Sequence, residues 1–277
     1  MLWIPQQGII RVEHNLGTVG SLTAGTSVTT GASATTKGTP AQIFAATAFD
    51  TYWMWIGAYE YSAVTTASQG AMDILVGAAT EDILIPNLLF GYATAGGGPS
   101  GSNKQWVFPL YIPAGTRISV QAAGARTSTA FRVCIALYGG SGIPPWRVGT
   151  RVITYGMGTI PNGTTIVPGA SAAEGSWTQI VAATTQDHFA LFPSFQLTAD
   201  TSVTTSNIAV DVGVGAATEE EIMQSLQYGI TANETMSGPV PCFPCFDDIP
   251  SGTRLVMRAS NSGVNDGGYN GVIHCVS

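Results

Sequence analysis

Charged side chains are scarce in this 277-residue sequence: they make up 10% of it, against about 25% in an ordinary soluble protein. Lysine is nearly absent, since Lys37 and Lys104 are the only two. A surface so poor in charge gains little solubility from self-repulsion. Large permanent interfaces are depleted in charge. We therefore expect part of the surface to be covered by other chains and the rest to carry neutral hydroxyls.

Clusters of basic residues and long apolar runs are also missing. The net charge is −7 and the arginines are scattered, which argues against a duplex nucleic-acid partner, because such binders gather Lys and Arg against phosphates. No apolar run approaches the ~18 residues of a membrane-spanning helix. The N-terminus lacks the basic start and apolar stretch of a signal peptide. We expect no nucleic acid, no membrane, and synthesis in a reducing cytoplasm that keeps the cysteines as thiols.

The second half of the sequence repeats phrases of the first half. Three segments recur in the same order at offsets of 137 or 138 positions. The matched pairs are 42–47 with 179–184, 73–82 with 211–220, and 112–117 with 249–254. A period of this length suits one domain with its own core. We predict two copies of one module, which is more typical of building or binding than of catalysis, because one active site needs no second copy.

These matches divide the chain into four parts. Modules at 21–138 and 150–277 flank a linker at 139–149, which is dense in turn-forming Gly, Ser and Pro. Residues 1–20 match nothing in the second copy. They allow two interpretations: an N-terminal arm that adds a strand to a neighbouring chain, or the ordinary first strand of the first module.

Within each module the side-chain pattern is that of β-strands. The stretch 50–61 is apolar on both faces, which favours a central strand, and 189–197 is its counterpart. Alternation in 117–122, 131–137 and 254–259 is typical of strands with one buried face. Short strands split by Gly, Ser, Thr and Asn indicate an all-β fold with little helix: two tandem antiparallel β-sandwich or jelly-roll modules.

One turn motif and one helix signal recur at matched positions. Ile-Pro-x-Gly-Thr precedes a strand at 112–116 and again at 249–253, and predicts a tight turn with its glycine at positive φ. Thr218, three residues before Glu221 and followed by acids, predicts a helix over 218–229. In the first copy, Pro86 limits the matching segment to one helical turn at most.

The cysteines offer one metal-like spacing. Cys242 and Cys245 form a C-x-x-C pair, and His274 with Cys275 would complete four ligands. Structural zinc is usually held by two close pairs on turns, whereas neighbours in a strand point to opposite faces. The redox alternative lacks its βαβ pattern. We predict no metal and no cofactor, and expect buried thiols.

The acids and histidines form no recognisable catalytic motif. The paired acids are Glu81 with Asp82, the run 219–221, and Asp247 with Asp248. They lack the alternate spacing of a calcium loop. The histidines are His14, His188 and His274. No nucleophile elbow, His-Glu-x-x-His or phosphate loop accompanies them, so we predict no catalytic residue and no enzyme.

Aromatic side chains crowd the stretch 52–61. Tyr52, Trp53, Trp55, Tyr59 and Tyr61 fall on both faces of this expected central strand, and we interpret them as core. They could alternatively form a sugar-stacking platform. We expect an exposed platform to come instead from three loop residues. These are Trp106, Trp146 and Trp177.

Arg117 and Arg254 hold equivalent outward positions in the two copies. In a chain with ten basic residues, two arginines in register predict specific ion pairs with carboxylates of another chain or domain. The alternative is an exposed strand arginine of little energetic consequence.

Several phrases resemble a type of virion structural protein in tailed bacteriophages. They are Ile-Pro-x-Gly-Thr-Arg before an alternating strand, and the segment 77–91, set in a composition rich in Thr, Ser, Ala and Gly and poor in lysine. The resemblance covers the second half of each module. It implies a component of the virion, such as a capsid decoration protein, a head–tail accessory or part of a fibre, and such proteins are commonly trimeric. No catalytic residue carries over, because the matched positions are structural.

The interpretation that joins these observations is a non-enzymatic virion structural protein. A capsid decoration or cement protein fits best; it would form a homo-oligomer, with a trimer favoured, and bind the major capsid protein or other virion proteins. The alternative is a tail fibre, spike or head–tail accessory that binds a receptor or cell-surface glycan. A glycan-active enzyme is a third reading, which needs two carboxylates about 5–10 Å apart in a cleft. The only dense acidic set is Asp247–Asp248 with 219–221.

Overall fold

The structure is a computed structural model in which every element is a β-strand. It describes residues 9–16, 24–60, 68–78, 80–92, 104–125, 127–141, 147–169, 172–197, 206–215, 218–230, 241–242, 245–262 and 269–277. The first half holds β1 (Arg11–His14), β2 (Thr26–Thr29), β3 (Ala41–Phe44), β4 (Thr51–Glu60), β5 (Ser68–Val76), β6 (Asp82–Tyr92), β7 (Lys104–Phe108), β8 (Ile118–Gly124) and β9 (Ala130–Gly139). The second holds β10 (Val152–Tyr155), β11 (Thr164–Ile166), β12 (Thr178–Val181), β13 (Ala190–Leu197), β14 (Ser206–Val214), β15 (Glu220–Ile230), β16 (Pro241–Cys242), β17 (Leu255–Asn261) and β18 (Tyr269–Val276). The prediction of an all-β fold is confirmed. Over the described residues, no helix has the length and apolar character to cross a membrane.

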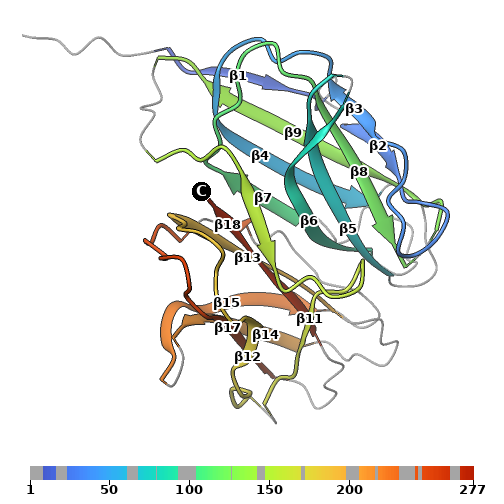
Figure 1. The fold of residues 1–277 in the computed structure, drawn as a ribbon. Coiled ribbons are helices and arrows are strands. Elements are labelled where there is room, and N and C mark those ends of the chain that lie inside the picture. The colour runs from blue at the N-terminus through green and yellow to red at the C-terminus, as the bar shows by residue number, and fades with distance from the viewer. Residues whose placement is uncertain are drawn as a thin grey trace, which may run out of the picture.

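Each half of the chain folds into a pair of sheets (Figure 1). Sheet I has β9 beside β4 and β4 beside β7, with β1 and β2 sharing the other edge of β9. Sheet II runs β3-β8-β5-β6. Sheet III has β18 beside β13, with β10 and β11 sharing its other edge. Sheet IV runs β12-β17-β14-β15.

The two halves therefore use the same pairing order. The register carries this likeness down to single residues: Val12 pairs with Tyr138 in sheet I, and Val152 pairs with Val276 at the matching place in sheet III. The pairs inside each half are antiparallel, as the strand pattern predicted. That the halves arose by duplication stays a prediction from the sequence.

The residues that alternation placed inward are buried. Met54 and Ile56 of β4 have no exposed surface, and β4 lies between β9 and β7 as expected of a central strand. The same holds for the inward faces of the other strands whose pattern was clean. These residues are Ile118, Val120, Ala122, Phe131, Val133, Ile135, Leu137, Leu255, Met257 and Ala259.

The Ile-Pro-x-Gly-Thr segments form matching turns. Gly115 and Gly252 have φ of 81° and 87°, which confirms the predicted positive φ. In each turn a buried threonine closes the loop: Thr47 donates to the carbonyl of Pro113, and Thr184 to that of Pro250, both at 2.8 Å. The turn thus holds β8 or β17 against the strand that precedes β4 or β13.

The helix expected over 218–229 is wrong, because this segment is the strand β15. β15 pairs with β14 along its length, and the register shifts opposite Asp211, where Ser225 has a φ of 51°. Such a β-bulge adds one residue and breaks the two-residue period, which imitates helical spacing in the sequence. β6 carries the same bulge at Asn87, with a φ of 55°.

Pro86 is tolerated in β6 because this strand lies at the edge of sheet II, where a missing amide hydrogen costs no ladder bond. The single turn of helix allowed for this segment does not form.

The structure places Arg11–His14 in the first module's own sheet. β1 pairs with β9, as the ordinary-first-strand interpretation expects. Although residues 1–20 match no sequence in the second copy, β1 has a structural counterpart there, the strand β10. Residues 1–8 and 17–20 of the proposed arm, and 142–146 of the linker, lie outside the described residues.

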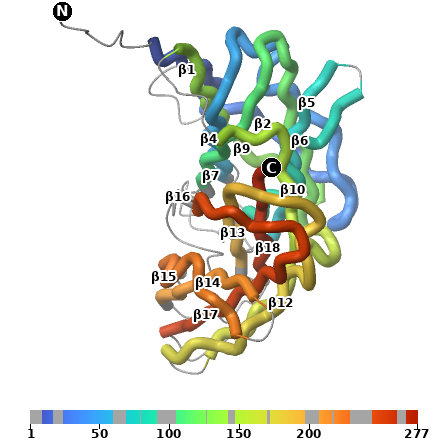
Figure 2. The backbone as a smooth tube through the Cα atoms, turned by 60° about the vertical axis from the view of Figure 1, so that its left-hand side comes forward, coloured from blue at the N-terminus to red at the C-terminus, as the bar shows by residue number. Residues whose placement is uncertain are grey.

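The two halves pack against each other in one defined way. The outer face of sheet III covers the edge of the first sandwich formed by β6 and β7, and Val152, Phe192 and Val276 join the first half's apolar core. β16, from the second half of the chain, also pairs in parallel with β7, so this strand extends sheet I across the boundary (Figure 2). The chain end at Ser277 lies in this joint, bonded to Thr150 and Arg151.

Candidate functional site

The described residues of the possible zinc site, His274, Cys275 and Cys245, do not converge. His274 and Cys275 follow one another in β18 and face opposite ways: Cys275 belongs to the core of the second half, while His274 faces the first. This confirms the expected opposition. Cys245 lies against Leu191 across an isolated bridge, and the side chain of Cys242 lies outside the described residues. Burial raises the pKa of Cys245 and Cys275, and raises that of Cys134 to about 11, so these thiols are held protonated.

His274 instead belongs to a buried chain of hydrogen bonds between the halves. The Thr154 hydroxyl donates to the carbonyl of Pro86 at 2.5 Å, so it accepts from Nδ1 of His274 at 2.8 Å. Nε2 of His274 then accepts from Ser194 at 2.8 Å, and Ser194 accepts from the indole nitrogen of Trp106 at 2.9 Å. Both ring nitrogens are thereby satisfied with the imidazole neutral. Burial lowers the pKa of His274 to about 3.

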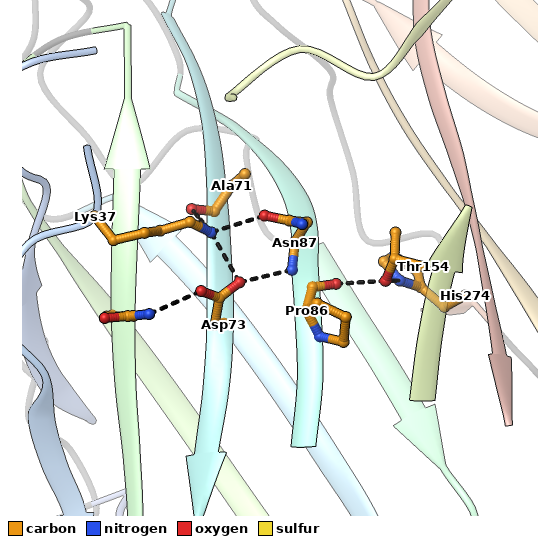
Figure 3. Close-up of polar contacts among 8 residues, drawn as sticks. Lys37, Ala71, Asp73, Pro86, Asn87, Thr154 and His274 are labelled. Atoms are coloured by element: carbon orange, nitrogen blue, oxygen red, sulfur yellow. Dashed lines mark hydrogen bonds and ion pairs between the residues drawn. The ribbon is translucent and has the colours of Figure 1, made fainter. Parts of the chain in front are cut away.

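A second polar cluster surrounds Asp73 on the outer face of sheet II (Figure 3). The Lys37 ammonium lies 2.8 Å from its carboxylate and also contacts the carbonyl of Ala71 and the amide oxygen of Asn87. The backbone amide of Asn87 and the side chain of Gln121 donate to the same carboxylate. Burial lowers the pKa of Lys37, and the attraction of Asp73 opposes that shift.

This cluster is joined to the boundary through the bulge in β6. Pro86 and Asn87 both stand opposite Asp73, outside the paired ladder. The backbone amide of Asn87 donates to Asp73, and the carbonyl of Pro86 accepts from Thr154, as Figure 3 shows. The bulge therefore orients one strand toward both networks.

The second half holds a related cluster around Asp211. Arg258 contacts Asp211 and Glu174 at 2.9 and 2.6 Å, and also contacts Glu221. Its guanidinium lies 4.4 Å from the ring centroid of Trp177. The three carboxylates are close enough to bind a cation, and here the arginine occupies that place. A shallow hollow of about 330 Å³ beside Glu174 is lined mainly by Gly, Pro, Ser and Thr.

The predicted pairing of Arg117 and Arg254 is found, but not between chains or domains. Arg117 pairs with Glu81 at 3.0 Å and Arg254 with Glu219 at 2.6 Å, each inside its own half. The hydrogen bond from Arg254 lowers the pKa of Glu219. The two arginines brace the loops before β6 and β15, which explains their common register.

The acidic set considered for glycan cleavage is engaged by arginines. Glu219 and Glu221 contact Arg254 and Arg258, and Asp248 contacts Arg147. His188 lies against Tyr155, whose hydroxyl is 3.0 Å from its Nε2. Burial lowers the pKa of His188, opposed by Asp187. These contacts tie the residues to the fold of the second half.

The aromatic side chains divide differently from the expectation. Trp106, expected in a loop, lies on β7 and is buried. Trp53, Trp55 and Tyr59 are half-buried on the outer face of sheet I rather than core. Trp53 contacts Phe246 of the second half at a centroid distance of 6.1 Å. Tyr61 and Trp146 lie outside the described residues.

Exposed apolar side chains also border this sheet. Of six large hydrophobic side chains exposed among the described residues, Ile9, Ile10, Val12 and Phe246 border sheet I. Val12 pairs with Tyr138, and Tyr138 pairs with Trp53. The result is an apolar strip along sheet I, which suits contact with another protein surface. The sequence shows the aromatic residues of this strand, but it does not show which face of the strand lacks a covering layer.

No protein-family model matches the chain, and no curated protein matches it either. Among solved structures it is similar to PNGF-II, at 8% identity and a TM-score of 0.40 over 98% of this chain and 65% of that one. It is similar to a structure of Broad Bean Stain Virus at 9% identity and a TM-score of 0.31, over 82% of this chain and 76% of that one. It is similar to a structure of infectious bursal disease virus, Gx strain, at 12% identity and a TM-score of 0.26, over 97% of this chain and 72% of that one. At such identities and scores these likenesses carry no conclusion about function.

Proposed function

We propose that this chain is a non-enzymatic structural protein of a virion, and that it acts as a capsid decoration or cement protein. The observation that carries the proposal is the apolar strip along sheet I, where Val12 is 49% and Phe246 47% exposed. The scarcity of charge and the phage-like phrases support the same role. The charged groups near the candidate sites pair within the chain, which leaves neutral surface for contacts.

The mechanism is the burial of this neutral surface against neighbouring virion proteins, the major capsid protein among them. Each copy could bind weakly and still hold the particle together. When several copies are joined in one oligomer, the first contact brings the others close to their sites, so they bind at high effective concentration. An N-terminal segment ahead of β1 could add a strand to a neighbour. The homo-oligomer proposed with this role, with a trimer favoured, would supply that multiplicity.

The test is to locate the protein on purified virions. Antibody labelling of intact particles should cover the capsid, and quantitative mass spectrometry should find the chain in numbers comparable to the capsid protein. Absence from purified virions would overturn the proposal. A deletion of residues 1–10, which spares β1, should release the protein from particles if the segment adds a strand, while a full-length control stays bound.

The second candidate is a tail fibre, spike or head–tail accessory that binds a receptor or glycan. The half-buried Trp53 and Trp55 on one open sheet face favour it, since flat aromatic rings commonly stack on sugars. Labelling confined to the tail, together with binding to host cell-surface glycan that is lost in Trp55→Ala, would support it. Release of sugar from that glycan on incubation would instead support an enzyme.

A further inference from the structure

The joint between the two halves has two sides. One side is a face, the outer surface of sheet III, where Val152, Phe192 and Val276 are at most 1% exposed. The other side is an edge, the gap between β6 and β7, where Ile85, Leu88 and Phe108 are fully buried. Phe192 enters this edge and lies 4.4 Å from Phe108, measured between ring centroids.

Because the halves share their pairing order, each side has a counterpart that remains partly exposed among the described residues, although Phe246 of the second half contacts Trp53 at the border of one of them. The counterpart of the face is the outer surface of sheet I, where Val12, Trp55 and Tyr138 match Val152, Phe192 and Val276 by register. We call it the free face. Val12 is 49% exposed where Val152 is 1% exposed, and Trp55 and Tyr138 are half-buried.

The counterpart of the edge lies along β15. Met223, Leu226 and Cys245 match Ile85, Leu88 and Phe108 in strand order. We call it the free edge. These three side chains are half-buried against the core of the second half, whereas their counterparts have no exposed surface. Each chain therefore carries one buried copy of this interface, and a counterpart of each of its two sides that is only partly buried.

We propose that the free face of one chain docks on the free edge of a second copy of the same chain. The occupant is argued from the interface inside the chain: the face and the edge already bind each other once, with apolar contacts on both sides. The polar contact across this interface also has its counterparts. His14 stands at the place of Thr154, and the carbonyl of Gln224 stands at the place of the Pro86 carbonyl.

Docking of this kind joins different surfaces of the two copies. A heterologous contact closes into a ring when its rotation permits, and otherwise continues as a filament. A closed trimer would place the modules alternately around one axis, each contact repeating the one inside the chain. This inference deepens the assembly role proposed above by naming the surfaces used. It is measured on purified protein without virions, so its failure and that of the virion role are separable.

The experiment measures mass in solution with two blocked variants. Wild-type chain, 28.7 kDa as a monomer, should form an oligomer by light scattering and native mass spectrometry. Val12→Arg blocks the face and Met223→Glu blocks the edge, and each alone should lose the ring. Val167→Arg, at a 59% exposed apolar residue elsewhere, is the matched control and should assemble as wild type.

Mixing the two blocked variants gives the sharpest result. The intact edge of Val12→Arg and the intact face of Met223→Glu can still meet, so an equimolar mixture should give a dimer that grows no further. Tyr138→Arg and Leu226→Glu provide a second pair if circular dichroism shows either first variant unfolded. A monomeric wild type, single variants that assemble normally, or a mixture of folded variants without dimer would each overturn the proposal.

Discussion

Lys37 and Arg258 neutralise equivalent carboxylates from different places in the two halves. Asp73 and Asp211 match at an offset of 138, and each accepts a backbone amide from a bulge residue at positive φ, Asn87 or Ser225. Around them two positions have exchanged roles. The counterpart of Lys37 is Glu174, and the counterpart of Arg258 is Gln121. Each carboxylate thus has a cation beside it, which comes from the loop before β3 in the first half and from the strand β17 in the second.

This exchange predicts that the charge can be moved by design. Lys37→Glu removes the cation from a carboxylate whose side chain is 5% exposed, and breaking a buried pair costs about 3–5 kcal/mol. Adding Gln121→Arg rebuilds the arrangement of the second half, so the double variant should recover most of that loss. Urea unfolding followed by tryptophan fluorescence measures both free energies.

Gln121→Arg alone is the control for this experiment. It adds a second cation beside Lys37 and should stabilise the protein little or not at all. If the double variant is as unstable as Lys37→Glu, the two positions do not act through the same carboxylate.

The shared boundary predicts that the two halves unfold together. Phe192 of β13 is fully buried in the apolar core of the first half, so the first half alone would lose part of its core and the second half alone would expose this apolar face. Wild type should show one calorimetric transition. Phe192→Ala should lower stability by about 3–5 kcal/mol, and Phe192→Asp should split the transition in two because it places a charge in the joint. Two well-separated transitions in wild type would contradict this coupling.

His274 predicts a loss of stability in mild acid. Its folded pKa is about 3, well below the ~6.5 of an unfolded histidine. Between these values the unfolded chain binds a proton that the folded chain excludes, so the stabilisation is full above about pH 6.5 and declines as the pH falls. The slope approaches about 1.4 kcal/mol per pH unit, and His188 contributes in the same direction.

The measurement is the free energy of unfolding between pH 7 and pH 5, above the range in which ordinary carboxylates titrate. His274→Gln should flatten the slope even though it lowers stability at pH 7. His14→Gln, at an exposed side chain, is the matched control and should keep the wild-type slope. An unchanged slope in His274→Gln would mean that other groups cause the acid sensitivity.

The sequence predicted local features well and long-range ones poorly. Strand faces such as Ile118, Val120 and Ala122 follow from a period of two, and the turn glycines from their neighbours. The bulges at Asn87 and Ser225 break that period, so the spacing over 218–229 predicts a helix where the structure has the strand β15. The sequence does not predict the burial of Trp106, because that burial depends on contacts with the second half of the chain, such as the hydrogen bond to Ser194. Lys37 and Asp73 were visible only as a rare lysine and an acid 36 positions apart.

The turn glycines allow a test of backbone strain that packing does not complicate. Gly115 and Gly252 have positive φ, and a Cβ added at either would meet no atom within 4 Å. An alanine there pays for the left-handed backbone alone, about 1–2 kcal/mol. Gly115→Ala should therefore lower the free energy of unfolding by that amount, and Gly115→Asn by less, because asparagine tolerates this region. Since Gly252 has the same geometry, Gly252→Ala should cost the same within error, and the two losses should add because the turns share no contact. Unequal or non-additive losses, measured by urea unfolding, would show that the two turns are not equivalent in energy although they match in shape.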